Sequence, residues 1–439
     1  MTPPSHSPRA QRWLARLLVA PFLAAVLATG QPVAPSVAMV PIDVAAAAEV
    51  TPLPDPGVLT AQLKKISTKG IGKVGVVVTT TDGQVLANRS GSRALTPAST
   101  MKVPTTMAAL QILGADRTFA TTVLDAGDGR VVLVGGGDPL LTDKTSTLAD
   151  KPASLQRLAA TTAAALKAAG RTRIALRYDA SLFSGPTFSP HWKKKWLGWE
   201  ARVAALEINS GKISGGRASA NPPKTAATAF AKRLKAAGIK VTSIASGKAP
   251  ATATELARVT SAPLSRIIRR TLLISDNVAA ETLSRHAAIA RGQAGSFTGA
   301  AANVRAWLSE RGLWASGAKI LDGSGLAPGS KLTPAMLAGA IRLALADATF
   351  APVVVGLPVA GESGTLKNRF DDKSEKAGRH VVHAKTGTLS RLAGLTGFVT
   401  TKDGAVLVFA ELANDATSYY RAYDWLDREA AVMARCGCR

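Results

Sequence analysis

Residues 96–110 of the chain read TPASTMKVPTTMAAL, a short polar turn that leads into a largely apolar run. The run predicts a helix over about residues 100–113, which ends at Gly114. Ser99 and Lys102 are three positions apart and therefore share one face of this helix. Burial beside other cations lowers the pKa of a lysine until it can act as a base, and a helix N-terminus stabilises charge on a serine oxygen. The stretch predicts a serine nucleophile with a lysine base, although a plain helix start with a solvated lysine has the same pattern.

A second polar motif, Ser275-Asp276-Asn277, falls between two predicted helices at about 263–274 and 278–290. Ser, Asp and Asn are the preferred residues at helix N-caps, so the motif is also explained as a simple capping turn. In a functional interpretation, Ser275 relays a proton and Asn277 holds a substrate amide in a polar loop between the helices.

The third motif, Lys385-Thr386-Gly387-Thr388, lies in the segment 379–389, whose alternation and β-branched residues predict a strand. An exposed strand can bind an extended peptide through its main chain. Lys385 and the hydroxyls of Thr386 and Thr388 would then bind a terminal carboxylate, and Gly387 would leave room for the approaching backbone.

Helices and strands are mixed along the chain, with hairpins near both ends. Three Asp-Gly turns predict hairpins, at residues 73–87, 119–134 and 394–412. The predicted helices cover about residues 100–113, 153–169, 225–237, 263–274, 278–290, 299–311, 334–346 and 418–435. This order favours an α/β (α+β) fold, with antiparallel sheets covered by helices and no repeating βαβ wheel.

Composition limits the class of protein. At 439 residues, with 46% hydrophobic and 19% charged residues, the chain fits a folded protein of two to three domains, or one domain with an insertion. The formal net charge of +25 indicates a cationic surface that attracts polyanions. The two cysteines, Cys436 and Cys438, lie in the last four residues, which excludes a disulfide-framework fold.

The N-terminus carries an export signature. Residues 1–30 run from an arginine-bearing stretch through a short apolar segment to small residues, which predicts a signal peptide. Residues 31–57 are rich in Pro and Ala and predict a linker. An exported protein acts outside the cytoplasm, at the cell wall or the outer face of the membrane. We therefore expect its polyanionic partners to be wall polymers or a membrane surface, and not nucleic acid.

Several common chemistries have no sequence support. The chain has no H-E-x-x-H, no G-x-S-x-G elbow, no P-loop and no G-x-G-x-x-G after a strand. Metal, nucleotide and α/β-hydrolase chemistry therefore all lose support. His383 is predicted to pack beside a sheet. Three tryptophans flank a run of lysines over residues 192–199, which we interpret as a solvated face with packed rings, the alternative being a surface that contacts glycan or wall polymer.

The motifs S-x-x-K, S-D-N and K-T-G in this order are shared by penicillin-binding proteins and class A β-lactamases. More specifically, residues 58–438 resemble the D-alanyl-D-alanine carboxypeptidase/endopeptidase family of low-molecular-mass class C penicillin-binding proteins, the S13 peptidases. Four further segments share the resemblance: 133–139, 322–326 with 332–334, 357–361 with 364–366, and 384–389.

The resemblance implies a β-lactamase/transpeptidase-like domain with an inserted accessory domain. The distance between the first two motifs exceeds what a compact domain of this kind needs. We therefore expect a penicillin-binding domain at residues 58–119 and 256–439 and the inserted domain at 120–255. The segment 322–326 is expected to be a turn that borders the active site.

The resemblance also implies an activity. Ser99 attacks the carbonyl of the penultimate D-Ala, Lys102 takes its proton, and Ser275 passes the proton to the leaving D-Ala. The backbone amides of Ser99 and Thr388 form the oxyanion hole, and water hydrolyses the acyl-enzyme. By this resemblance, the reaction needs neither a metal nor an organic cofactor. The products are those of a carboxypeptidase on peptidoglycan stem peptides, or of an endopeptidase when the leaving amine belongs to a cross-link. β-Lactams would acylate Ser99 as covalent inhibitors.

Three alternatives stay open at this point, of which the first shares the fold and the other two belong to different classes of protein. A β-lactamase of the same fold needs a dedicated glutamate for deacylation, and no E-x-x-L-N lies between the first two motifs, because Glu207-Ile208-Asn209 is too short. A non-catalytic cationic protein of the cell envelope would need none of Ser99, Lys102, Ser275, Asn277 or Lys385. A secreted nucleic-acid binder ranks third, since no binding module is recognisable.

Overall fold

In the computed structural model, residues 52–146 and 152–437 are described, and they form two five-stranded sheets. The predicted signal peptide and most of the predicted linker lie outside these residues. The first sheet has the order β2-β1-β10-β9-β8, with bounds β1 Lys73–Thr80, β2 Val85–Arg89, β8 Val382–Leu389, β9 Leu392–Thr400 and β10 Val406–Asn414. The second has the order β6-β5-β4-β3-β7, with bounds β3 Ala120–Asp125, β4 Arg130–Gly135, β5 Arg173–Asp179, β6 Lys240–Ser246 and β7 Thr254–Thr260.

The first sheet is antiparallel throughout, as expected from the sequence. Two predicted hairpins, β1–β2 around Asp82-Gly83 and β9–β10 around Asp403-Gly404, are confirmed. The long strand β10 is buried on both faces, because Leu412 packs into one apolar cluster and Phe409 into another. Strand β8 is the last strand in the order and therefore lies at an edge of the sheet, and it carries the third motif.

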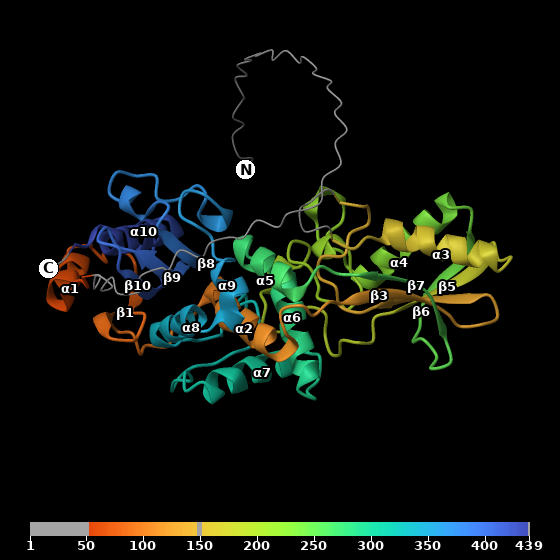
Figure 1. Cartoon of the computed structure of the whole chain (residues 1–439), viewed down its shortest axis with the longest axis horizontal. Coiled ribbons are helices and arrows are strands. Elements are labelled where there is room, and N and C mark those ends of the chain that lie inside the picture. Colours follow the sequence, from red (N-terminus) through yellow and green to blue (C-terminus); the bar gives the residue numbers. More distant parts are fainter. Residues whose placement is uncertain (1–51, 147–151, 438–439) are drawn as a thin grey trace, which may run out of the picture. The chain divides into compact units, whose positions relative to one another are not determined.

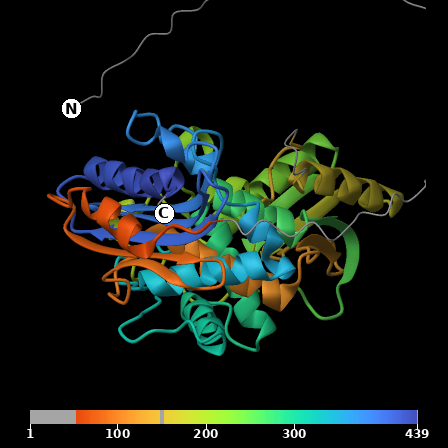
Figure 2. The same ribbon diagram turned by 60° about the vertical axis from the view of Figure 1, so that its left-hand side comes forward.

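Helices cover both faces of the first sheet (Figures 1 and 2). Helices α1 (Pro56–Lys64) and α10 (Tyr419–Arg435) pack on one face, where Trp425 is buried. On the other face lie α2 (Lys102–Leu113) and α8 (Pro334–Ala346). The remaining long helices of this region are α5 (Leu264–Leu273), α6 (Asn277–Ala290) and α7 (Phe297–Glu310), with the short α9 (Ala351–Val354). Their common core brings the first and second motifs against the same end of the sheet.

The second sheet mixes parallel and antiparallel pairs, which the sequence analysis did not anticipate. The predicted hairpin β3–β4 around Asp128-Gly129 is confirmed, and β7 returns to pair with β3. Strands β4, β5 and β6 are parallel because α3 (Leu155–Ala168) and α4 (Pro222–Ala236) connect them as crossovers. Strand β7 runs to Thr260 and so crosses the expected boundary at residue 255.

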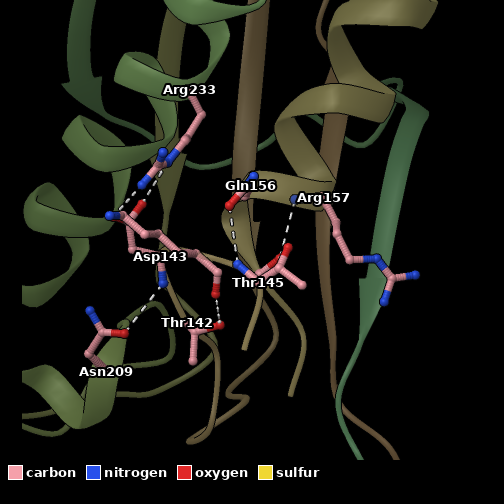
Figure 3. A network of polar contacts seen from close by, with 9 residues as sticks. Thr142, Asp143, Thr145, Gln156, Arg157, Asn209 and Arg233 are labelled. Carbon is pink, nitrogen blue, oxygen red and sulfur yellow. Dashed lines mark hydrogen bonds and ion pairs between the residues drawn. The ribbon is translucent and has the colours of Figure 1, made fainter. Parts of the chain in front are cut away.

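A polar network fastens the helices of the second sheet to the loop after β4 (Figure 3). Arg233 of α4 donates two hydrogen bonds to the carboxylate of Asp143, at 3.1 and 2.7 Å. The backbone N–H of Asp143 donates to Oδ1 of Asn209 at 3.4 Å, and that of Thr145 to the side chain of Gln156 at 3.2 Å. The network also fixes the turn at Asn209, whose neighbour Ser210 donates to the Asp276 carboxylate at 3.2 Å.

The eight predicted helices are observed to within a few residues, and the described residues contain two further α-helices, α1 and the short α9, that were not predicted. Helix α1 begins at Pro56, with Asp55 as its N-cap, so Pro56 and Gly57 are helical where a linker was expected. Over the described residues, no single helix has the length and apolar character that a membrane crossing needs, and only the bent pair Pro334–Ala346 and Ala348–Val354 reaches that standard jointly. Cys436 is disulfide-bonded, and Cys438 lies outside the described residues.

Candidate active site

The first motif lies at the start of α2. Residues Ala98–Met101 form a 3-10 turn that runs directly into the helix, so Ser99 stands half-buried just before the first α-helical residue, Lys102. The Lys102 side chain is completely buried. Its Nζ lies 2.8 Å from Ser99 Oγ and donates to Asn277 Oδ1 at 2.6 Å and to the Ser324 carbonyl at 2.9 Å. One ammonium group therefore joins the first motif, the second motif and a further loop.

The second motif connects α5 to α6 through a strained residue. Ser275 has φ of 59°, in the left-handed region that costs most residues free energy. Asp276 caps α6 by accepting a hydrogen bond from the Ala279 backbone at 3.0 Å, as the capping interpretation expected. This geometry turns the Ser275 hydroxyl to the third motif, where Lys385 Nζ donates to its Oγ at 3.0 Å.

The third motif occupies the edge strand β8. Lys385 is completely buried and also donates to the Thr386 carbonyl at 2.7 Å. The hydroxyl of Thr386 pairs with that of Thr365 at 2.7 Å, and the hydroxyl of Thr388 pairs with the phenol of Tyr423. The two threonine hydroxyls are thus engaged by other residues and not by Lys385.

The glycine of this motif has a packing reason. A Cβ on Gly387 would lie 2.6 Å from the Pro97 carbonyl, so glycine lets β8 approach the turn before Ser99. That the same glycine also leaves room for an approaching ligand backbone stays a prediction. On the same strand His383 stacks on Phe398, with ring centroids 4.8 Å apart, which confirms that it packs beside the sheet.

Burial sets the protonation of the two lysines. It lowers the pKa of Lys102 to about 8, against the opposing effect of the acidic groups Asp322, Glu281, Glu200 and Asp276. Burial, followed by the charge of Lys102, lowers the pKa of Lys385 well below its usual range. Each lysine is therefore easier to deprotonate than a free one, and each contacts a serine hydroxyl.

The loop at residues 322–325 borders the site, as expected from the sequence. Asp322 accepts hydrogen bonds from the backbones of Gly325 and Ala327 at 2.9 and 2.7 Å, and from the Trp192 indole at 2.7 Å. Glu281 accepts from the backbones of Gly323 and Ser324, at 3.1 and 2.8 Å. These two buried carboxylates fix the loop so that the Ser324 carbonyl points at Lys102.

Two acidic residues at the site were missed by sequence reasoning. Glu281 follows Asn277 by four positions on α6, so helical periodicity could have placed it on the same face. Glu200 gives no such signal: it lies in an irregular segment, and its Oε2 accepts a hydrogen bond from Asn277 Nδ2 at 3.1 Å. Burial raises the pKa of Glu200, and Asn277 and Lys102 oppose this shift. A glutamate therefore reaches the site although no E-x-x-L-N motif is present.

The tryptophan cluster divides in two. Trp192 is buried and hydrogen-bonded to Asp322, which agrees with a packed ring, whereas 74% of Trp199 is exposed.

Among the described residues, one group could hold a metal ion, formed by Asp372, Glu375 and Asp424, whose ligand atoms lie within 4.8 Å of one another. Burial, with Asp427 as the next largest cause, raises the pKa of Glu375 to about 8. The group contains no motif residue.

Known proteins share sequence with this chain over most of its length. A family model described as the D-Ala-D-Ala carboxypeptidase 3 (S13) family matches residues 59–216 and 204–432. The chain is 35% identical to carboxypeptidase DacB of Mycolicibacterium smegmatis, over 96% of this chain and 95% of that protein. It is 28% identical to a D-alanyl-D-alanine carboxypeptidase of Actinomadura, over 75% of each chain.

A solved structure supports the fold. The crystal structure of penicillin-binding protein 4 from Haemophilus influenzae superposes with a TM-score of 0.72 at 21% identity, over 84% of this chain and 97% of that one. The fold resemblance, the sequence relatives and the family match all point the same way. The chain belongs to the D-Ala-D-Ala carboxypeptidase 3 (S13) family of serine peptidases.

Proposed function

We propose that the protein is a serine D-alanyl-D-alanine carboxypeptidase that acts on peptidoglycan stem peptides through an acyl-serine intermediate. One observation carries the proposal: the Lys102 Nζ lies 2.8 Å from Ser99 Oγ within a network that also contains Asn277. Simple binding to the cell envelope requires no such network. Membership of the family supplies the substrate class, stem peptides that end in D-Ala-D-Ala.

In the acylation step, Ser99 Oγ attacks the carbonyl of the penultimate D-Ala. Neutral Lys102 keeps two N–H groups, which Asn277 Oδ1 and the Ser324 carbonyl can accept, so its lone pair is left for the Ser99 hydroxyl proton. The backbone N–H groups of Ser99 and Thr388 stabilise the oxyanion. Acylation should therefore rise with pH as Lys102, whose pKa is about 8, loses its proton.

The peptide C–N bond then breaks. The nitrogen of the leaving D-Ala takes the proton that Lys102 removed from Ser99, and Ser275 passes this proton on. Asn277 binds the substrate amide, while Lys385, Thr386 and Thr388 bind the terminal carboxylate at the edge of β8. A carboxylate only accepts hydrogen bonds, so each threonine hydroxyl donates to it while its present partner, Thr365 or Tyr423, donates to the threonine oxygen. Water then hydrolyses the ester and restores Ser99. When the amine belongs to a cross-link, the same steps give endopeptidase activity.

We further propose the domain division and the location. Residues 58–119 and 256–439 form the penicillin-binding domain, and residues 120–255 form the inserted accessory domain, whose sheet β7 completes. Residues 1–30 direct export, and residues 31–55, up to the N-cap of α1, link the signal peptide to the folded chain. The protein then acts at the cell wall or at the outer face of the cytoplasmic membrane, where its charge of +25 favours anionic polymers or lipid headgroups.

The proposal is tested with a fluorescent penicillin and with a stem pentapeptide. The wild type should form a stable adduct by intact mass and release D-Ala, and Ser99→Ala should do neither. Ser309→Ala removes an exposed hydroxyl on α7 and should behave as the wild type. Rapid penicillin turnover without an adduct would identify a β-lactamase, and no reaction in any variant would favour the envelope-binding protein.

A further inference from the structure

We propose that Glu200 is a positioning residue for acyl transfer, whose carboxylate fixes the side-chain amide of Asn277 and, through it, the orientation of Lys102, and whose negative charge also acts on the Lys102 ammonium. The inference rests on the proposed acyl-serine function. It assigns a role to a residue outside all three motifs.

The contacts form a continuous chain from Glu200 to the nucleophile. Asn277 Nδ2 donates to Glu200 Oε2 at 3.1 Å, Lys102 Nζ lies 2.6 Å from Asn277 Oδ1, and Ser99 Oγ lies 2.8 Å from that same Nζ. In this chain of contacts, the side chains of Asn277 and Lys102 separate Glu200 from Ser99. Glu200 therefore acts on the reaction indirectly.

Glu200 and Lys102 together leave Asn277 one favourable orientation. The Lys102 ammonium can only donate hydrogen bonds, and the Glu200 carboxylate can only accept them. Rotating the Asn277 amide by half a turn would place N–H groups against the ammonium and the carbonyl against the carboxylate, so that both contacts become repulsive. Without Glu200, only the Lys102 contact selects the orientation.

The orientation of Asn277 matters in two ways. Its Oδ1 accepts one hydrogen from Lys102, which helps to aim the lysine lone pair at Ser99. Its Nδ2 carries two hydrogens. One donates a hydrogen bond to Glu200, so the other is left to donate to a substrate carbonyl. A single carboxylate thus sets both the base and the amide that would hold the substrate.

The backbone around Glu200 is held firmly enough for such a role. Its N–H donates to the Trp196 carbonyl at 2.9 Å, and Val203 donates to the Thr187 carbonyl at 2.8 Å. The neighbouring Ala201 and Val203 are completely buried. The carboxylate is therefore presented from a fixed segment and not from a loose loop tip.

The charge of Glu200 acts on Lys102 together with other groups. Acidic Asp322, Glu281 and Asp276 face Lys102 as well, and Lys385 faces it from β8. Lys212 and Asp276 act on Glu200 itself. Asp322 and Glu281 bind backbone N–H groups of the 322–327 loop, and Asp276 caps α6, so each of these has a structural task. Glu200 is the acidic residue that hydrogen-bonds the amide of Asn277.

Loss of this negative charge has a defined direction. Glu200 favours the protonated form of Lys102, whereas the proposed base must be neutral. Removing the charge should therefore move the acidic limb of the acylation profile to lower pH. At a pH on that limb, the rate changes by about tenfold for each unit by which the limb moves.

Three variants separate charge from geometry. Glu200→Gln keeps an acceptor for Asn277 but removes the charge, and should shift the limb to lower pH. Glu200→Asp keeps the charge and should leave the limb near its wild-type position. Glu200→Ala removes both, and should also lower the plateau rate by roughly tenfold, because Asn277 is no longer fixed. Glu255→Gln removes the same charge from the exposed strand β7 and should change neither quantity.

The measurement is the rate of penicillin acylation, followed by intact mass between about pH 6 and 10, with thermal unfolding as the check that each variant is folded. An unshifted limb in Glu200→Gln would overturn the inference while wild-type acylation stands. So would an unchanged acylation profile with accumulation of the acyl-enzyme, because Glu200 would then act on the hydrolytic water. A wild type that forms no Ser99 adduct would overturn the proposed function, and this inference with it.

Discussion

Lys102 and Lys385 are buried, and each lies against a serine hydroxyl; among the described residues neither has a carboxylate in direct hydrogen-bond contact. A buried ammonium without a close counter-ion is costly, so burial favours the neutral amine. The same residues that supply reactivity therefore work against stability. Backbone strain adds to this, since Ala98 in the turn before Ser99 has φ of 47° and Ser275 between α5 and α6 has φ of 59°.

Gly325 makes a test at the scale of single residues. Its φ is 78°, and a Cβ there would lie 1.8 Å from the carbonyl of Ala98, next to the nucleophile. We expect Gly325→Ala to destabilise the protein by about 2–4 kcal/mol and to slow acylation, because both strain and overlap must be relieved. Chemical denaturation and the penicillin reaction measure the two effects.

The matched control is Gly127→Ala, where φ is 74° and nothing lies within 4 Å of the added Cβ. It should cost only about 1 kcal/mol of backbone strain and leave acylation unchanged. If both variants lost the same free energy of unfolding and the same acylation rate, the overlap with the Ala98 carbonyl would not be the cause.

At the scale of elements, strand β10 and helix α10 bury a pair of carboxyl groups between them. Glu411 on β10 has no hydrogen-bond partner for either carboxylate oxygen among the described residues, and Glu429 on α10 is bonded to Arg89. Burial, then Glu429 and Asp427, raises the pKa of Glu411 well above its usual range. Burial raises the pKa of Glu429 to about 7. The folded protein thus keeps protons that the unfolded chain releases.

The pH dependence of stability follows from this proton count. Above the usual glutamate pKa the folded state binds more protons, so the free energy of unfolding falls as pH rises towards and beyond about 7. Glu411→Gln should make the free energy of unfolding less dependent on pH. Between about pH 5 and 8, the variant should become more stable than the wild type by about 1–3 kcal/mol. Denaturant titrations at several pH values measure it. The exposed Glu255→Gln should keep the wild-type slope, and an equal slope in Glu411→Gln would contradict the assignment.

Elements and site residues differ in how far the sequence could predict them. Hairpins with Asp-Gly turns and helices that end at glycine were predicted because their signals are local. Strand β6 was not, since most of its side chains are exposed and it lacks a clear apolar alternation. Glu281 was within reach through its spacing from Asn277. Glu200 was not, because only the tertiary fold brings residue 200 to residue 277.

At the scale of the whole molecule, charge and chemistry are separable. The net charge of +25 resides largely in exposed side chains, whereas Lys102 and Lys385 are shielded from solvent. Salt screens exposed charges over about 10 Å at 0.1 M but affects buried contacts much less. Attraction to a polyanionic wall and acylation of Ser99 should therefore respond differently to ionic strength.

We expect binding to vesicles of anionic phospholipid, or to purified cell walls, to fall severalfold between about 0.05 and 0.5 M salt. Penicillin acylation should change by less than about twofold over the same range. Co-sedimentation measures the binding, and vesicles of zwitterionic lipid are the control. Binding that is insensitive to salt would show that charge is not its basis.

Trp192 and Glu200 reach the site from the chain between the first and second motifs, and they contact Asp322 and Asn277. A chimera that exchanges residues 186–212 for a relative's segment would keep every motif residue and still alter the surroundings of the nucleophile. Transplanting the three motifs into a smaller scaffold would leave both contacts behind. A transfer of this chemistry to another protein therefore has to include the segment that carries Trp192 and Glu200 as well as the three motifs.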